Sequence, residues 1–191
     1  MEGPGCMEAN ARVSKMVKPQ DCLLIVIDVQ KKLTPLIAAT PEIVANILKL
    51  IRLARIIEVP VLVTEQENLG EMVDEVGLEL ADIRPVRKLS FSCFGEDAFT
   101  RRLASYDRRT LILTGLETHI CVAQTALGAS SGFRSVVVAD ATGARAPFDK
   151  ETALARLKDN GVTITSTGML MYELLQKAGT DIFRAALPLL K

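Results

Sequence analysis

Three residues that could cooperate in acyl-transfer chemistry stand where short apolar runs end. Asp28 closes the run CLLIVI, Lys88 lies at the end of an extended segment, and Cys121 comes shortly after the run TLILTG. A cysteine thiol becomes a nucleophile when a carboxylate removes its proton, and a lysine ammonium can stabilise the charge that develops. The three residues together predict nucleophilic catalysis, provided that the fold brings their segments to one place.

The position of Cys121 allows two interpretations. If Thr118 caps a helix that begins here, Cys121 is the third helical residue, where free backbone N–H groups and the helix dipole favour a thiolate. The same N–H groups could hold an oxyanion during acyl transfer. However, cysteine is also a common small residue of hydrophobic cores. Position alone leaves both a nucleophile and a core residue open.

His119 is the only histidine of the chain, and helix geometry excludes it as the base for Cys121. Each helical residue turns the chain by roughly 100°, so residues two apart point about 200° away from one another. A Cys–His pair and a Ser–His–Asp arrangement are therefore both disfavoured. The proton acceptor is expected to be a carboxylate at a neighbouring strand end, with a pKa raised by burial.

Asp28 fits that description, because a carboxylate that follows an apolar run is costly to bury unless it is paired or hydrogen-bonded. Other roles are open: it could cap the next segment, or be the acidic residue of a receiver domain or of a nucleotide site. Lys88 could pair with Asp28 and stabilise a thiolate, although a single lysine is more often a surface residue. The combination of three strand ends is what favours catalysis.

The elements that must position these residues are short β-rich runs alternating with longer helical patterns. Strands are expected at residues 22–28, 61–64, 83–88, 110–114, 135–139 and 162–165. Helices are expected from 40 to about 58 and at 96–106, 118–131, 149–160 and 167–177, with a long loop or short helix across 65–82. Thr40 is expected to cap the first helix, with Pro41 as its first residue, and Gly161 to end the helix at 149–160.

Repeated strand–helix units predict a three-layer α/β/α fold, in which helices cover both faces of a central, mostly parallel, six-stranded sheet. Rossmann-like folds of this kind bind their ligands at the carboxyl ends of the strands. Because the three candidate residues follow such ends, the topology is expected to gather them above the sheet.

Length and apolar patterning predict one domain in this chain of 191 residues. We expect an N-terminal extension over residues 1–19 and a single domain over residues 20–191. The extension lacks the apolar middle of a signal peptide, and no apolar run reaches the length of a membrane span. A cytoplasmic protein without a membrane partner is the expectation.

Charge and cysteine content argue against several partners and cofactors. The 23 basic residues balance the 23 acidic residues, so no global field favours nucleic acid or an anionic membrane. The cysteines, at positions 6, 22, 93 and 121, form no CxxC motif, and the chain has a single histidine. These features predict neither a disulfide framework nor a zinc site. We expect a small-molecule substrate, no metal and no other cofactor.

Over most of residues 21–178 the chain resembles the isochorismatase-like cysteine hydrolases. The resemblance rests on CLLIVIDVQ with its strand-end aspartate, on the lysine segment PVRKLSFSCF, and on the block LTGLETHICVAQTALGA. The last block contains a Gly-x-x-Thr-x-x-Cys-Val pattern after a strand and is the most specific of the three. The tripeptide TEQ at 64–66 also looks like the family's second strand end.

The resemblance implies that Cys121 is the nucleophile, Asp28 the general base, and Lys88 the residue that aligns and polarises both. It also implies a cis peptide bond between Leu116 and Glu117, which would turn the Glu117 amide inward to form an oxyanion hole with the Cys121 amide. The implied mechanism is attack on an amide-like carbon, a thioester-type intermediate and its hydrolysis.

Departures from the family pattern narrow the substrate. Family nicotinamidases bind a metal through an aspartate and several histidines between the positions of Asp28 and Lys88, where this chain has no histidine. Isochorismatases cleave a vinyl ether and need not use the cysteine. With Cys121 present, the chain is more similar to the short uncharacterised hydrolases of the amidohydrolase branch, which implies a small amide, carbamoyl or related substrate.

Two further expectations complete the interpretation. Gln30, Thr118 and His119 are candidates to line the substrate pocket. The family often forms dimers, tetramers or octamers, which implies a homo-oligomer, and the apolar C-terminal segment DIFRAALPLL would suit an interface. The alternatives to an enzyme are an α/β binding or regulatory module without chemistry, and an oligomeric scaffold.

Overall fold

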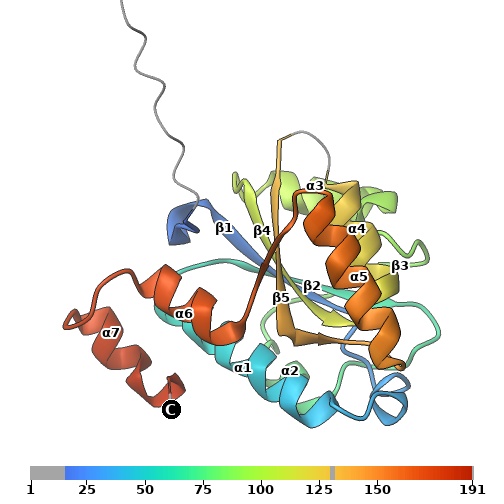
Figure 1. Ribbon diagram of the computed structural model, residues 1–191, viewed down its shortest axis with the longest axis horizontal. Coiled ribbons are helices and arrows are strands. Elements are labelled where there is room, and N and C mark those ends of the chain that lie inside the picture. The colour runs from blue at the N-terminus through green and yellow to red at the C-terminus, as the bar shows by residue number, and fades with distance from the viewer. Residues whose placement is uncertain (1–15, 130–131, 191) are drawn as a thin grey trace, which may run out of the picture.

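A six-stranded sheet forms the centre of the computed structural model, which describes residues 16–129 and 132–190. Every strand is parallel to its neighbours, in the order β3-β2-β1-β4-β5-β6 (Figure 1). The strands are β1 (Cys22–Ile27), β2 (Val61–Gln66), β3 (Val86–Lys88), β4 (Thr110–Leu116), β5 (Arg134–Gly143) and β6 (Thr163–Thr165). The predicted α/β class and parallel six-stranded sheet are confirmed.

Helices cover both faces of this sheet. They are α1 (Thr40–Ile56), α2 (Asp74–Glu79), α3 (Asp97–Ala104), α4 (Ala123–Gly128), α5 (Pro147–Asp159), α6 (Thr167–Leu175) and α7 (Asp181–Ala186). Figure 1 shows α3, α4 and α5 on one face and α1 and α6 on the other, where α2 and α7 also pack against α1. The molecule therefore has the three layers that the strand–helix alternation predicts.

Strand β1 shows why the apolar run CLLIVI becomes an interior strand. Successive side chains of a strand point to opposite faces, and here Leu24 and Val26 join the core formed with α1, while Leu23 and Ile25 join the core formed with α3 and α5. All six residues of β1 are buried. A continuous apolar run is the pattern expected of a parallel strand covered on both faces.

Helix α1 begins one residue before the predicted first residue, Pro41, and without the predicted cap. Thr40 is the first helical residue, and its hydroxyl donates to the carbonyls of Ile37 (2.6 Å) and Thr34 (3.1 Å) instead of accepting from the helix. Pro41 lies in the first turn, as expected. At the end of α5, Gly161 has a φ of +80°, which agrees with its predicted role in terminating that helix.

Three other elements differ from the sequence prediction. The chain after β4 forms a π-helical turn, Thr118–Val122, before the short α4. Strand β5 continues beyond the predicted residues to Gly143 through a register shift against β4. The apolar C-terminal segment DIFRAALPLL, for which no helix is predicted, contains helix α7.

The remaining sequence expectations concern the termini and membranes. Most of the predicted N-terminal extension, residues 1–15, lies outside the described residues, and residues 19–21 form a 3-10 turn that leads into β1. Within the part of the chain that the structure describes, no helix has the length and apolar character needed to cross a membrane.

Candidate active site

Asp28, Lys88 and Cys121 meet at the carboxyl edge of the sheet. Asp28 follows β1, Lys88 is the last residue of β3, and Cys121 lies in the π-helical turn after β4. The Nζ atom of Lys88 lies 2.7 Å from Asp28 Oδ2 and donates to Cys121 Sγ at 3.5 Å. The convergence expected from three separate strand ends is present.

All three side chains are withdrawn from solvent: Asp28 is 0% exposed, Lys88 1% and Cys121 5%. A buried ion pair is stable only if its remaining polar atoms are also bonded. Lys88 meets this condition, because its ammonium also donates to Gln66 Oε1 (2.6 Å) and, at 3.3 Å, to the carbonyls of Ser90 and Phe91.

The two carboxylate oxygens of Asp28 have different surroundings. Oδ1 accepts a 2.8 Å hydrogen bond from Thr64 Oγ1. Oδ2 has the Lys88 ammonium close by, yet it accepts no well-aligned hydrogen bond from the described residues. The 2.7 Å distance establishes the ion pair between Oδ2 and Lys88, while Oδ1 is the oxygen that holds the Thr64 hydroxyl. Oδ2 is thus the oxygen able to receive a proton.

Burial raises the pKa of the Cys121 thiol to about 12, and the negative charge of Asp28 adds to this effect more than Lys88 opposes it. The thiol is therefore protonated at neutral pH, contrary to the thiolate that a helix N-terminus would favour. Burial alone would lower the pKa of Lys88, but the acidic groups around it, above all the Asp28 carboxylate, raise this pKa overall, so the lysine is cationic. Attack by Cys121 requires a base that acts as the bond forms.

The segment that leads to Cys121 turns through unusual backbone conformations. Gly115 has a φ of +130°, and a Cβ atom at this position would lie 2.0 Å from the Ile27 carbonyl oxygen. Glu117 follows with φ 59° and ψ 64°, in the left-handed region. Only glycine allows the close approach of β4 to β1 at residue 115.

The predicted cis bond between Leu116 and Glu117 is absent: every peptide bond of the described residues is trans. The chain changes direction here through the left-handed conformation of Glu117 instead. No cis bond therefore turns the Glu117 amide toward Cys121 in this structure.

Thr118 does not cap a helix as predicted. The capping position belongs to Glu117, and the Thr118 hydroxyl is buried without a hydrogen-bond partner among the described residues. Cys121 consequently lies within a π-helical turn and not at the third position of an α-helix.

The two remaining pocket candidates make contacts of different kinds. His119 Nδ1 lies 3.6 Å from Glu117 Oε2, and its Nε2 lies 3.7 Å from Asp149 Oδ2 in the first turn of α5. The Gln30 amide donates to the carbonyls of Gln66 and Gly70 and accepts from the Gln66 N–H. Gln30 therefore braces the loop after β2.

Thr64 and Gln66 belong to the site although neither was predicted as a site residue. Each contacts one charged partner, Thr64 the Asp28 carboxylate and Gln66 the Lys88 ammonium. Both come from the tripeptide TEQ at the end of β2, so polar residues at a strand end next to β1 were the signal that could have identified them.

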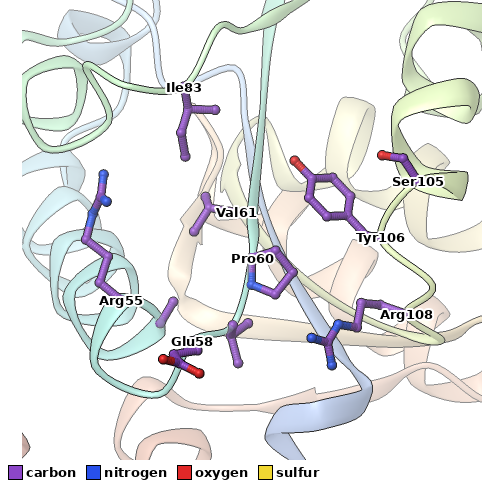
Figure 2. A pocket seen from close by; sticks show the side chains of 10 residues that line it. Arg55, Glu58, Pro60, Val61, Ile83, Ser105, Tyr106 and Arg108 are labelled. Atoms are coloured by element: carbon purple, nitrogen blue, oxygen red, sulfur yellow. The ribbon is translucent and has the colours of Figure 1, made fainter.

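Two cavities have linings that do not include Asp28, Lys88 or Cys121. One cavity, of about 510 Å³, lies at the opposite, amino edge of the sheet, between Pro60 before β2 and Tyr106 and Arg108 before β4, and Figure 2 shows its lining residues. A second cavity of about 440 Å³ is lined by Gln30 and Gln66 and so lies beside the site. Among the described residues, no group of three or more histidine, cysteine or acidic side chains could hold a metal ion.

Known proteins with similar sequences carry the isochorismatase name. The model of the isochorismatase domain matches residues 22–169. Mouse isochorismatase domain-containing protein 2A is 33% identical over 179 residues, which are 92% of this chain and 85% of that protein. The secreted isochorismatase effector Isc1 of Phytophthora sojae is 30% identical over 191 residues, with 96% and 90% covered.

Solved structures show the same fold. The MAR1 ribonuclease of Caenorhabditis elegans superposes with a TM-score of 0.85 at 29% identity, covering 91% of both chains. The YcaC gene product of Escherichia coli, described as an octameric hydrolase of unknown specificity, has a TM-score of 0.83 at 22% identity and covers 92% of both chains. Membership of this family supports a hydrolase activity. The family match over most of the chain, together with the shared fold, shows that the protein belongs to the isochorismatase family.

Proposed function

We propose that this protein is a metal-independent cysteine hydrolase that acts on a small amide, carbamoyl or related substrate. The observation that carries the proposal is the position of the Lys88 ammonium, in contact with both the Asp28 carboxylate and the Cys121 thiol. A carboxylate, a cation and a thiol in one buried cluster are the groups that covalent acyl transfer requires. Gln30, Thr118 and His119 are the proposed pocket residues, and Gln30 lines the cavity beside the site.

The proposed reaction has two halves. As Cys121 Sγ bonds to the substrate carbonyl carbon, Asp28 Oδ2 takes the thiol proton, and Lys88 stabilises the negative charge that passes between them. The carbon–nitrogen bond then breaks, and the leaving amine takes the proton from Asp28. In the second half the water oxygen attacks the thioester carbon while Asp28 takes a proton from that water. The carbon–sulfur bond then breaks, the acid leaves, and Asp28 returns the proton to the Cys121 sulfur. We propose the Cys121 amide as one donor to the oxyanion.

Burial limits the size of the substrate. The Cys121 thiol is only 5% exposed, and Leu89 and Phe91, which follow Lys88 in the chain, present exposed apolar side chains. A small molecule with a compact reacting group suits so buried a thiol better than a polynucleotide does. The ribonuclease name belongs to the Caenorhabditis elegans protein, and the balanced charge of this chain favours no nucleic acid partner.

The test is a hydrolysis screen over primary amides, carbamoyl compounds and vinyl ethers, with a structured RNA as a separate arm. We expect turnover of an amide or carbamoyl compound, loss of turnover in Cys121→Ala, and an acyl adduct on the Cys121 peptide by mass spectrometry. Cys22→Ala, which changes another buried thiol outside the cluster, is the matched control. Turnover that survives in Cys121→Ala, or RNA cleavage without amide turnover, would overturn the proposal.

A non-catalytic binding module or scaffold is the alternative. It predicts that the wild-type protein forms no acyl adduct with any compound of the screen, and that Asp28→Asn and Cys121→Ala bind the same ligands as the wild-type protein. An adduct confined to Cys121 excludes this alternative.

We further propose a cytoplasmic homo-oligomer formed by a single domain over residues 20–191. Exposed apolar side chains on α6 and α7, namely Met169, Tyr172 and Ile182, support an interface on these helices. Light scattering is expected to give a multiple of the 20.8 kDa chain mass, and cell fractionation checks the location. A monomer at all concentrations would refute the assembly without affecting the proposed chemistry.

A further inference from the structure

Glu117 combines burial with an unfavourable backbone conformation, directly before the turn that carries Cys121. Six described residues other than glycine have a positive φ, and only Asp28 and Glu117 among them are buried. Asp28 belongs to the candidate site, and Glu117 directly precedes the turn that carries Cys121. A bulky residue in the left-handed region costs free energy and persists only where its surroundings hold it there.

The side chain of Glu117 is held from the side of α5. Arg145, in the segment between β5 and α5, donates from Nε to Glu117 Oε1 at 3.0 Å. His119 Nδ1 lies 3.6 Å from the other carboxylate oxygen, and its Nε2 approaches Asp149 of α5. The Glu117 side chain is about 5% exposed, whereas that of Arg145 is 53% exposed. The Glu117 carboxylate is thus buried, and its cationic partner Arg145 is partly exposed at the surface.

The backbone of Glu117 connects this anchor to the nucleophile. Its carbonyl accepts from the Ile120 N–H at 2.9 Å and so starts the π-helical turn in which Cys121 lies. A rotation at Glu117 would move Cys121 relative to Lys88, which is supported independently by Gln66 and by backbone carbonyls. The two halves of the site therefore have separate supports.

We propose that Glu117 and Arg145 form a positioning pair, in which the ion pair holds the left-handed backbone of Glu117 and thereby keeps Cys121 in contact with Lys88 and Asp28. The inference rests on the proposed role of Cys121 as a nucleophile. Neither residue of the pair touches the reacting atoms. They act through the geometry of the turn.

The test uses p-nitrophenyl acetate as an activated acyl donor near neutral pH. In this probe reaction Cys121 Sγ bonds to the acetyl carbon, nitrophenolate leaves, and Asp28 takes the thiol proton. We expect Arg145→Met and Glu117→Ala to slow the Cys121-dependent burst of nitrophenolate by about tenfold. Arg156→Met, which removes an exposed guanidinium from α5, is the matched control and leaves the burst unchanged.

Rescue by glycine separates positioning from packing. Glycine adopts the left-handed conformation without a Cβ penalty, so Glu117→Gly is expected to acylate faster than Glu117→Ala. In the Glu117→Gly background Arg145→Met should have no further effect, because the ion pair is already gone. A purely structural role would instead lower the melting temperature of all three variants equally and leave the burst rate of the folded protein intact.

A second readout does not depend on turnover. The pKa of the Cys121 thiol, followed by thiolate absorbance against a Cys121→Ala reference, depends on the distance of the thiol from Asp28, and it should fall in Arg145→Met. If the wild-type protein gives no Cys121-dependent burst, the proposed function fails, and this pKa decides the positioning pair alone. An unchanged burst and an unchanged pKa in both Arg145→Met and Glu117→Ala overturn the inference.

Discussion

Thr64 donates a 2.8 Å hydrogen bond to Asp28, and the pairing of Ile27 with Thr64 in the sheet places the two residues on adjacent strands. This bond occupies one carboxylate oxygen and directs the other toward Lys88. The orientation of the proposed base is therefore determined by the register of β1 and β2, before any substrate binds.

Thr64→Val should leave the fold intact while removing the donor to Asp28. A buried carboxylate oxygen without its donor costs about 1–3 kcal/mol of stability, and turnover should fall because the carboxylate is free to rotate. Urea unfolding and steady-state kinetics measure the two effects. Thr114→Val is the matched control, since the Thr114 hydroxyl is equally buried but donates to the Ile25 carbonyl. Equal losses of turnover in both variants would contradict the assignment.

Lys88→Met should be among the most destabilising substitutions of the chain. It leaves Asp28 charged and buried without its partner, which typically costs about 3–5 kcal/mol. The double variant Asp28→Asn/Lys88→Met removes both charges and should be more stable than Lys88→Met, although both are inactive. Lys158→Met, an exposed change in α5, should alter stability by less than about 0.5 kcal/mol. A double variant that is less stable than Lys88→Met would show that the charges are not coupled.

Stability should decline at alkaline pH because of the buried thiols. Burial raises the pKa of Cys22 and Cys121 from 9.0 to about 12, and that of Cys93 to about 11. A thiol whose pKa is higher in the folded chain binds its proton more tightly there, so the resulting stabilisation is complete below pH 9.0 and is lost as the pH rises toward these values. Measurement of the free energy of unfolding against pH should show this decline, with a smaller slope in Cys22→Ala. A slope that Cys22→Ala leaves unchanged would contradict the shift assigned to Cys22.

Gly115→Ala should separate β4 from β1. The added Cβ would lie 2.0 Å from a backbone oxygen of Ile27, and the φ of +130° is unfavourable for alanine, so a loss of about 3 kcal/mol or more is expected. Gly77→Ala in α2 has no neighbouring atom within 4 Å and should be stabilised by about 0.5–1 kcal/mol. Melting temperatures of the two variants check the contrast. A wild-type melting temperature for Gly115→Ala would show that the two strands can move apart without cost.

The sequence predicts the parts of this molecule that depend on local pattern. CLLIVI must be buried on both faces, and the strand–helix alternation leaves a parallel sheet as the consistent arrangement. The meeting of Asp28, Lys88 and Cys121 follows from that topology, because the carboxyl ends of parallel strands share one edge.

The parts that could not be predicted depend on contacts between distant segments. The π-helical turn at Cys121 and the left-handed Glu117 lie next to two such contacts. Gly115 packs closely against the Ile27 backbone, and Arg145 donates a hydrogen bond to Glu117. The high pKa of Cys121 likewise depends on the depth of burial and the distance to Asp28. Neither quantity can be obtained from the position of a cysteine near a helix start.

The strand order carries a consequence for dissecting the protein. Lys88 ends the edge strand β3, and β2 and β1 lie between it and the Cys121 turn after β4. Division of the chain in the connection between α3 and β4 would leave Asp28 and Lys88 on one fragment and Cys121 on the other. Each fragment alone would lack a group that the proposed reaction needs, so the proposed hydrolysis would return only when the two halves recombine. The site would then serve as a built-in reporter of fragment complementation.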